Sequence, residues 1–86
     1  MEFRWNGWNR DQVAKHGVPP EEAEHVVRFA RRPYPQRTGA DKWYVVGRGT
    51  GGRFVEVAYL VGTDDEIFVI HAMPLGGRRR RTKRRN

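Results

Sequence analysis

The feature that most constrains the fold of this chain is a succession of three strand-like segments joined by two short turns. The segments run from Lys42 to Arg48, from Arg53 to Val61 and from Glu66 to Met73, and each is rich in Val, Ile, Tyr or Phe. The turns are Gly49-Thr50-Gly51-Gly52 and Gly62-Thr63-Asp64-Asp65. Parallel neighbours need a much longer crossover connection. These segments therefore predict a three-stranded antiparallel meander.

The last of these segments is apolar on both faces. Ile67 and Val69 would point to one side of a strand, and Phe68 and Ile70 to the other. A strand with this pattern is expected to be covered on both sides.

The first helix is predicted to begin at an N-cap residue after a short strand and to end at a glycine. Residues Glu2 to Trp5 alternate polar and apolar side chains, which predicts a short opening strand before the helix. Asn9 is a favourable N-cap, and Gln12 stands three residues later, as in a capping box. Gly17 supplies the left-handed residue that ends many helices.

A second helix is predicted from Pro20 to the residue before Pro33. Acidic residues open it and arginines close it, so the charges complement the helix dipole. Its apolar stripe at helical spacing consists of Ala23, Val26, Val27 and Ala30. The fold class predicted is α+β, in the order short strand, two helices, three-stranded antiparallel meander and basic C-terminal tail. The helices would cover one sheet face, and the other would be free for a substrate or partner protein.

The positive charge of the chain is concentrated at its C-terminus. Of 17 Lys and Arg residues in 86, seven lie in residues 76–86, while residues 1–75 hold ten basic and ten acidic side chains. The seven are Arg78, Arg79, Arg80, Arg81, Lys83, Arg84 and Arg85. We expect a neutral single domain over 1–75 and a flexible basic tail over 76–86. Such a tail favours a nucleic-acid partner, because neutralised phosphates release condensed counterions.

Composition excludes several classes of site. Cysteine is absent, which excludes disulfides and thiolate metal sites, and the three histidines are well separated, so no metal or cofactor is predicted. Apolar stretches reach only five or six residues, far short of about 20 needed to span a bilayer. We expect a cytoplasmic protein that does not enter membranes. Because so short a chain builds a small core, a homodimer or a complex with a partner chain is also expected.

Ordered motifs along the chain resemble one known family. They are Phe3-Arg4-Trp5-Asn6, Trp8-Asn9, Lys15-His16-Gly17-Val18, Glu21-Glu22-Ala23, Val46-Gly47-Arg48, Arg53 to Tyr59 and Phe68 to Ala72. Together they resemble the BrnT toxins of bacterial type II toxin-antitoxin systems. The family's strand motif usually ends in Ala-Arg, where this chain has Ala72-Met73.

The resemblance implies a RelE-like fold and ribonuclease activity. It also implies a cognate antitoxin, similar to BrnA, that neutralises the toxin and binds operator DNA together with it. RNA would be the substrate. The chain is accordingly predicted to be a metal-independent endoribonuclease toxin, with Met73 in place of an expected arginine.

Cleavage of RNA by its own 2′-hydroxyl needs a base, an acid and cations beside the phosphate. His71 is the leading proton-transfer candidate because it ends an otherwise apolar strand, and Lys15 and His16 stand together in a shared motif. Arg48 ends a strand where it could grip a phosphate. Tyr59, or Tyr44, could stack on a base or donate a proton.

Arg53 and the seven basic tail residues are the predicted nucleic-acid contacts. Structural alternatives remain for the main candidates: a histidine hydrogen-bonded into the core for His71, a helix-dipole contact for His16 and half-buried packing for Tyr59. Two other functions also remain open. The chain could be a non-catalytic module that binds nucleic acid or an antitoxin, or a structural protein whose tail only confers solubility.

Overall fold

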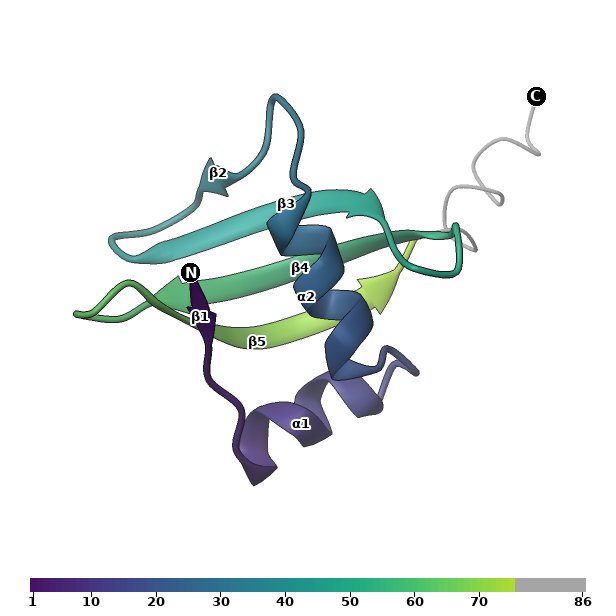
Figure 1. Ribbon diagram of the computed structural model, residues 1–86, viewed down its shortest axis with the longest axis horizontal. Helices are drawn as coiled ribbons and strands as arrows, with labels where there is room; N and C mark the ends of the chain where they lie inside the picture. The colour runs from purple at the N-terminus through teal and green to yellow at the C-terminus, as the bar shows by residue number, and fades with distance from the viewer. Residues whose placement is uncertain (76–86) are drawn as a thin grey trace.

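The computed structural model describes residues 1–75, which form two helices on a five-stranded mixed sheet (Figure 1). The helices are α1 (Gly7–Ala14) and α2 (Pro20–Arg28). The strands are β1 (Glu2–Phe3), β2 (Gln36–Arg37), β3 (Lys42–Arg48), β4 (Phe54–Val61) and β5 (Glu66–Pro74). The predicted basic tail, with its seven nucleic-acid contacts, lies outside the described residues.

The sheet order is β1-β5-β4-β3-β2. The three long strands pair antiparallel, as the short turns predicted. The two short strands complete the sheet. β1 confirms the predicted opening strand and pairs parallel with β5, Phe3 against Ile67. β2, which was not predicted, pairs antiparallel with β3. β1 can be parallel because both helices intervene before β5.

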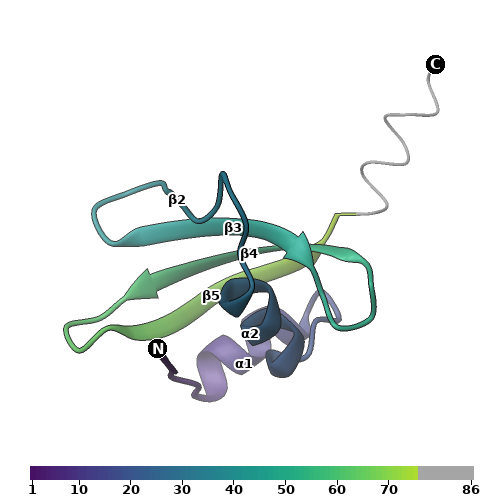
Figure 2. The same ribbon diagram turned by 45° about the horizontal axis from the view of Figure 1, so that its top comes forward.

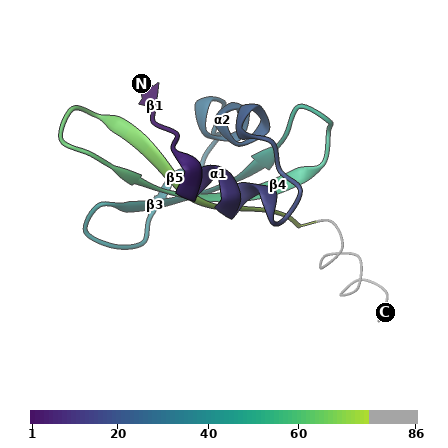
Figure 3. The same cartoon turned by 90° about the horizontal axis from the view of Figure 1, so that it is seen from below.

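Both helices lie against the same face of the sheet (Figures 2 and 3), α1 along β5 and α2 across β3 and β4. The core between them is made largely of valines. Its buried residues are Val13, Val18, Ala23, Val26, Val27, Val45, Val55, Val57, Tyr59, Ile67, Val69 and Ala72. The predicted stripe of α2 supplies three of them, and Ala30 packs at the margin. Small and branched side chains allow the helices to approach the sheet closely.

The start of α1 differs from the prediction. Asn6, rather than Asn9, is the N-cap, and its side-chain oxygen accepts from the Asn9 backbone N–H at 3.0 Å. Asn9 completes the capping box, because its Oδ1 accepts from the Asn6 N–H at 2.7 Å. Asn9 is fully buried and also donates to the Arg4 carbonyl, so it ties the helix to the β1 segment. Gly17 has φ of 72° and ends this region, as predicted.

A partly buried ion pair joins α2 to the β3–β4 turn. Arg53 Nη2 lies 2.7 Å from Glu22 Oε1, and its side chain is 42% exposed whereas that of Glu22 is 5% exposed. Arg53 also donates to the Gly17 carbonyl at 2.8 Å. The hydrogen bond to Glu22 raises the pKa of Arg53, against the opposing effect of burial. A Cβ at Gly49 would clash with the Glu22 carboxyl, so glycine at that position leaves room for the pair.

Replacing Glu22 with alanine is expected to lower the free energy of unfolding by about 2 kcal/mol. The loss stays moderate because water can reach part of the Arg53 guanidinium once its partner is gone. Urea denaturation monitored by circular dichroism measures it. Glu21→Ala, an exposed change on the same helix, is the control and should stay within about 0.5 kcal/mol of the parent. Equal losses in both variants would show that the ion pair does not stabilise the fold.

Candidate functional site

A polar network centred on Glu56 lies on the sheet beside the end of α1. The Tyr44 hydroxyl donates to Glu56 Oε1 at 2.9 Å, and His71 Nε2 lies 2.8 Å from Glu56 Oε2. The Glu56 side chain is 13% exposed and that of His71 is 36% exposed. A mostly buried carboxylate therefore holds an imidazole that solvent can reach.

The strand register explains why these three side chains meet. Ala58 of β4 stands between Tyr44 of β3 and His71 of β5. Glu56 is two residues from Ala58 and points to the same face, so it is a diagonal neighbour of both Tyr44 and His71. Diagonal pairs are within reach of long side chains. The small Ala58 side chain leaves the space that the network occupies.

A bulge in β5 sets the direction of His71. Ala58 pairs with His71, but the next residue, Tyr59, pairs with Val69, so Ile70 is an extra residue in β5. Strict alternation would place His71 on the same face as Val69, which is fully buried in the core. The extra residue reverses this, so His71 shares a face with Glu56. Bulges re-aim side chains in this way and are frequent beside active sites.

The end of α1 brings a second imidazole to the network. Lys15 is the C-cap of α1, and His16 follows it in a tight turn. The His16 and His71 rings are 5.5 Å apart between centroids, in an edge-to-face arrangement at 68°. Lys15 is exposed next to His16. The structure thus brings together two of the predicted residues, His71 and His16, and Lys15 directly precedes His16 in the chain.

This arrangement suits proton transfer. When Glu56 accepts the Nε2 proton of His71, it sets the tautomer and leaves Nδ1 to exchange a proton with a ligand. Two neighbouring imidazoles can act on one ligand as an acid and a base. Within residues 1–75, no group of three or more His, Asp or Glu side chains is arranged to hold a metal ion.

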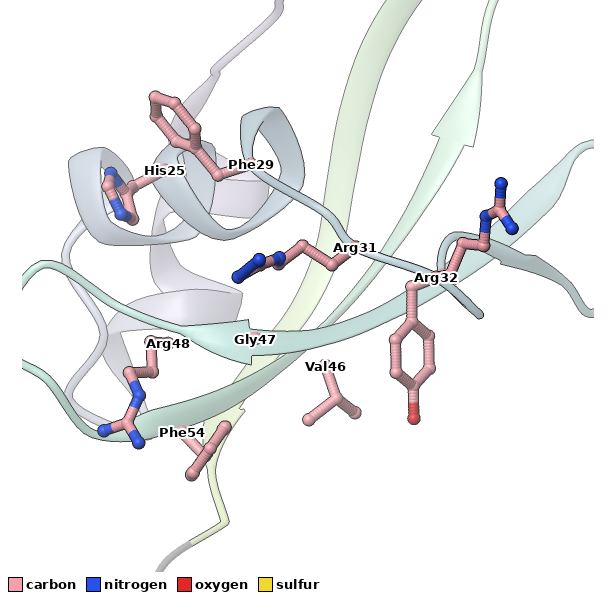
Figure 4. A pocket seen from close by; sticks show the side chains of 9 residues that line it. His25, Phe29, Arg31, Arg32, Val46, Gly47, Arg48 and Phe54 are labelled. Carbon is pink, nitrogen blue, oxygen red and sulfur yellow. The ribbon is translucent and has the colours of Figure 1, made fainter.

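Arg48 belongs to a different part of the surface. Arg48 stands four residues after Tyr44 in β3, at the far end of the β3–β4 pairing. Its guanidinium Cζ is 4.6 Å from the centre of the Phe54 ring. Arg48 Nη1 also donates to the Gly52 carbonyl at 2.9 Å. These contacts place it in a pocket of about 420 Å³ between α2 and the β3 edge (Figure 4). This register separates Arg48 from His71, and the catalytic role predicted for Arg48 stays a prediction.

Two further sequence candidates have structural roles. Tyr59 is 5% exposed in the core, where burial raises the pKa of its phenol, so we assign it to packing rather than to the predicted catalysis. Arg53, predicted to contact nucleic acid, is instead engaged with Glu22 and the Gly17 carbonyl. For Tyr59 the contacts favour the packing alternative, and for Arg53 the nucleic-acid contact stays a prediction.

Sequence reasoning overlooked Glu56, and weighed Tyr44 as a stacking residue or proton donor rather than as a partner of Glu56. One signal for Glu56 was present: it is an acidic residue between Val55 and Val57 in an otherwise apolar strand. A buried carboxylate of this kind needs partners. Local sequence could not name them, because Tyr44 and His71 lie 12 and 15 residues away.

Within residues 1–75, no helix is long and apolar enough to cross a membrane.

The two faces of β5 are covered to different extents. Ile67 and Val69 are buried under the helices. On the other face the ring of Trp8 in α1 stacks on that of Phe68, with 6.1 Å between ring centroids. The prediction of cover on both faces is confirmed only in part, since Phe68 and Ile70 stay partly exposed.

Comparisons with known proteins identify the fold. No protein-family model matches the sequence, and no curated protein matches it. The crystal structure of the Brucella abortus ribonuclease toxin BrnT superposes with a TM-score of 0.67 at 20% sequence identity. The match covers 86% of this chain and 95% of that protein. The chain therefore has a BrnT-like α+β fold.

Proposed function

We propose that this protein with a BrnT-like fold is an endoribonuclease toxin that cleaves RNA by activating its 2′-hydroxyl. The observation that carries the proposal is the Glu56–His71 hydrogen bond with the His16 ring beside it. The likeness to a ribonuclease toxin supports it, and the motifs quoted above agree.

In the proposed reaction the 2′-oxygen attacks the adjacent phosphorus. One imidazole takes the 2′-hydroxyl proton while the other donates a proton to the departing 5′-oxygen. The bond between phosphorus and the 5′-oxygen breaks, which leaves a 2′,3′-cyclic phosphate and a 5′-hydroxyl. We assign proton transfer to His71 and His16 and assign Glu56 to holding His71 in place.

The negative charge that grows on the phosphate needs a cation. Met73 pairs directly across from Glu56, so the position that usually holds arginine in the BrnT motif adds no charge here. Lys15, exposed beside His16, is the cation that we assign to this step. The basic residues of 76–86 would raise the local concentration of RNA.

The proposal includes a cognate antitoxin that covers this site and a toxin-antitoxin complex that binds operator DNA. The Glu56 network lies partly exposed at the surface, where a bound protein would block the two histidines. An activity assay with purified protein alone therefore tests the toxin without its inhibitor.

Purified protein in EDTA is expected to cleave single-stranded RNA to products with 2′,3′-cyclic phosphate and 5′-hydroxyl ends. Electrophoresis and end-group labelling identify these products. A matched oligonucleotide with 2′-deoxyribose throughout is the control and should stay intact, since it lacks the attacking hydroxyl. Deleting residues 76–86 should weaken cleavage without abolishing it. Absence of cleavage at micromolar protein, with RNA binding retained, would instead support the non-catalytic binding module.

A further inference from the structure

The pocket at the β3 edge is positively charged and separate from the histidine network. Arg31 and Arg48 line it together with exposed aromatic rings, and none of the described residues that line it is acidic. It opens where β2 stops pairing, because β2 contacts β3 only at Trp43 and Tyr44. Such a combination of cations and rings complements the phosphates and bases of an unpaired strand.

The two cations enter the pocket from opposite sides. Figure 4 shows Arg31 extending from the segment after α2 toward Gly47, whereas Arg32, which also lines the pocket, extends in another direction. Arg48 is held on the strand side by Phe54 and the Gly52 carbonyl. Within the described residues, neither Arg31 nor Arg48 has a carboxylate partner. Gly47 faces Val26 of α2, so Arg48 faces the other side of β3. Two arginines without counter-charges, one on each side of the strand, are suited to different phosphates of one RNA strand.

An aromatic ring stands at the rim of the same pocket. Phe29 is 66% exposed, just beyond the end of α2, with the His25 ring 4.7 Å away. It lies on the α2 side, opposite Arg48 and Phe54 (Figure 4). An exposed large ring beside free cations can stack an unpaired base of any identity.

The pocket is also connected with the Glu56 network. Tyr34, at the pocket wall, meets the Tyr44 ring edge-to-face at 6.2 Å, and Tyr44 donates to Glu56. Val46 lines the pocket and pairs with Glu56 across β3 and β4. A strand bound in the pocket can therefore continue over Tyr44 toward His71.

We propose that this pocket is a binding subsite for single-stranded RNA, in which Arg31 and Arg48 each contact one phosphate of the strand and Phe29 stacks a neighbouring base. The inference rests on RNA being the substrate, and adds that the substrate is unpaired where it enters the pocket. The subsite positions the strand but takes no part in proton transfer.

Binding of a fluorescent, fully 2′-O-methylated 12-nucleotide RNA to the full-length chain tests the proposal. This probe cannot be cleaved, so the measurement does not depend on catalysis. Replacing both Arg31 and Arg48 with glutamine is expected to weaken binding about tenfold. It should also lower the slope of log K against log salt by about 1.4, which corresponds to two phosphate contacts on a single strand. Anisotropy titrations at several salt concentrations measure both quantities.

The Phe29→Leu variant tests the contribution of base stacking to RNA binding independently of charge. It is expected to weaken binding about fivefold or more and to leave the salt slope unchanged, because no charge is removed. A duplex of the same sequence should be insensitive to Phe29→Leu. The matched control is Arg10→Gln, which removes one exposed charge from α1 and should change affinity less than twofold.

Unchanged RNA affinity and salt slope in the double arginine variant would overturn the subsite, even if that variant lost affinity for a protein partner. The ribonuclease proposal would survive this result if the parent protein still cleaves RNA. Conversely, if the parent protein fails to cleave RNA while these substitutions still weaken its RNA binding, the subsite proposal stands and the ribonuclease proposal fails. Circular dichroism confirms that each variant is folded.

Discussion

Replacing His71 with alanine is expected to lower the rate of RNA cleavage by about 10²- to 10⁴-fold, the range typical of a lost general acid or base. The reason is geometric as well as chemical. Within residues 1–75, His71 is the histidine held by a carboxylate, with its Nε2 atom 2.8 Å from Glu56 Oε2. Single-turnover cleavage of a labelled RNA measures the loss, since it separates chemistry from product release.

His71→Gln distinguishes proton transfer from structural support. Its side-chain amide can still donate a hydrogen bond to Glu56, but it cannot exchange a proton with RNA. We expect it to be as inactive as His71→Ala and to have a melting temperature close to that of the parent. Substantial cleavage by His71→Gln would mean that His71 only supports the strand, and the assignment of proton transfer would then be wrong.

Replacing Glu56 with glutamine is expected to lower kcat about 100-fold, the size of effect that follows from a misplaced reacting group. An amide can present either an oxygen or an NH₂ group to His71, so it no longer sets one tautomer. KM should change little, because Glu56 is mostly buried and we assign it no contact with RNA. Steady-state kinetics gives both parameters.

Nitrogen-15 NMR of the His71 ring provides a second measurement for Glu56, because the shifts show which nitrogen carries the proton. The parent should carry it on Nε2, and Glu56→Gln should show a mixture. Glu66→Gln is the matched control, since Glu66 is half-exposed on β5 and pairs with Arg4. It should leave kcat unchanged. A Glu56 variant with normal kcat and a single tautomer would exclude the positioning role.

Much of the fold was predictable because local signals were strong. The two short turns predicted the antiparallel order of β3, β4 and β5, and β3 has the predicted bounds. The helical spacing of Ala23, Val26 and Val27 predicted the buried face of α2. The alternation of Glu2 to Trp5 predicted β1, but not its parallel pairing with β5. β2 gave no such signal, because it is defined by its partner rather than by alternation.

The N-cap of α1 shows how tertiary contacts compete with a local signal. Asn6 and Asn9 are both favourable caps by residue type. The structure buries Asn9 completely and uses its amide to bind the Arg4 carbonyl, so Asn6 takes the cap. A choice between two equivalent residues depends on which one is buried, and that depends on the packing of α1 along β5.

The sequence by itself determined the α+β class, the antiparallel meander and the apolar face of α2, because these follow from spacing and turn residues. It also indicated His71 and His16 as candidates for proton transfer, because of their chemical type. Only the tertiary structure decided which groups act together. The bulge at Ile70 turns His71 away from the core, and the register places Glu56 between Tyr44 and His71. Strand register and bulges arise from pairing between distant segments, and a single residue of slip reverses the face of every side chain that follows.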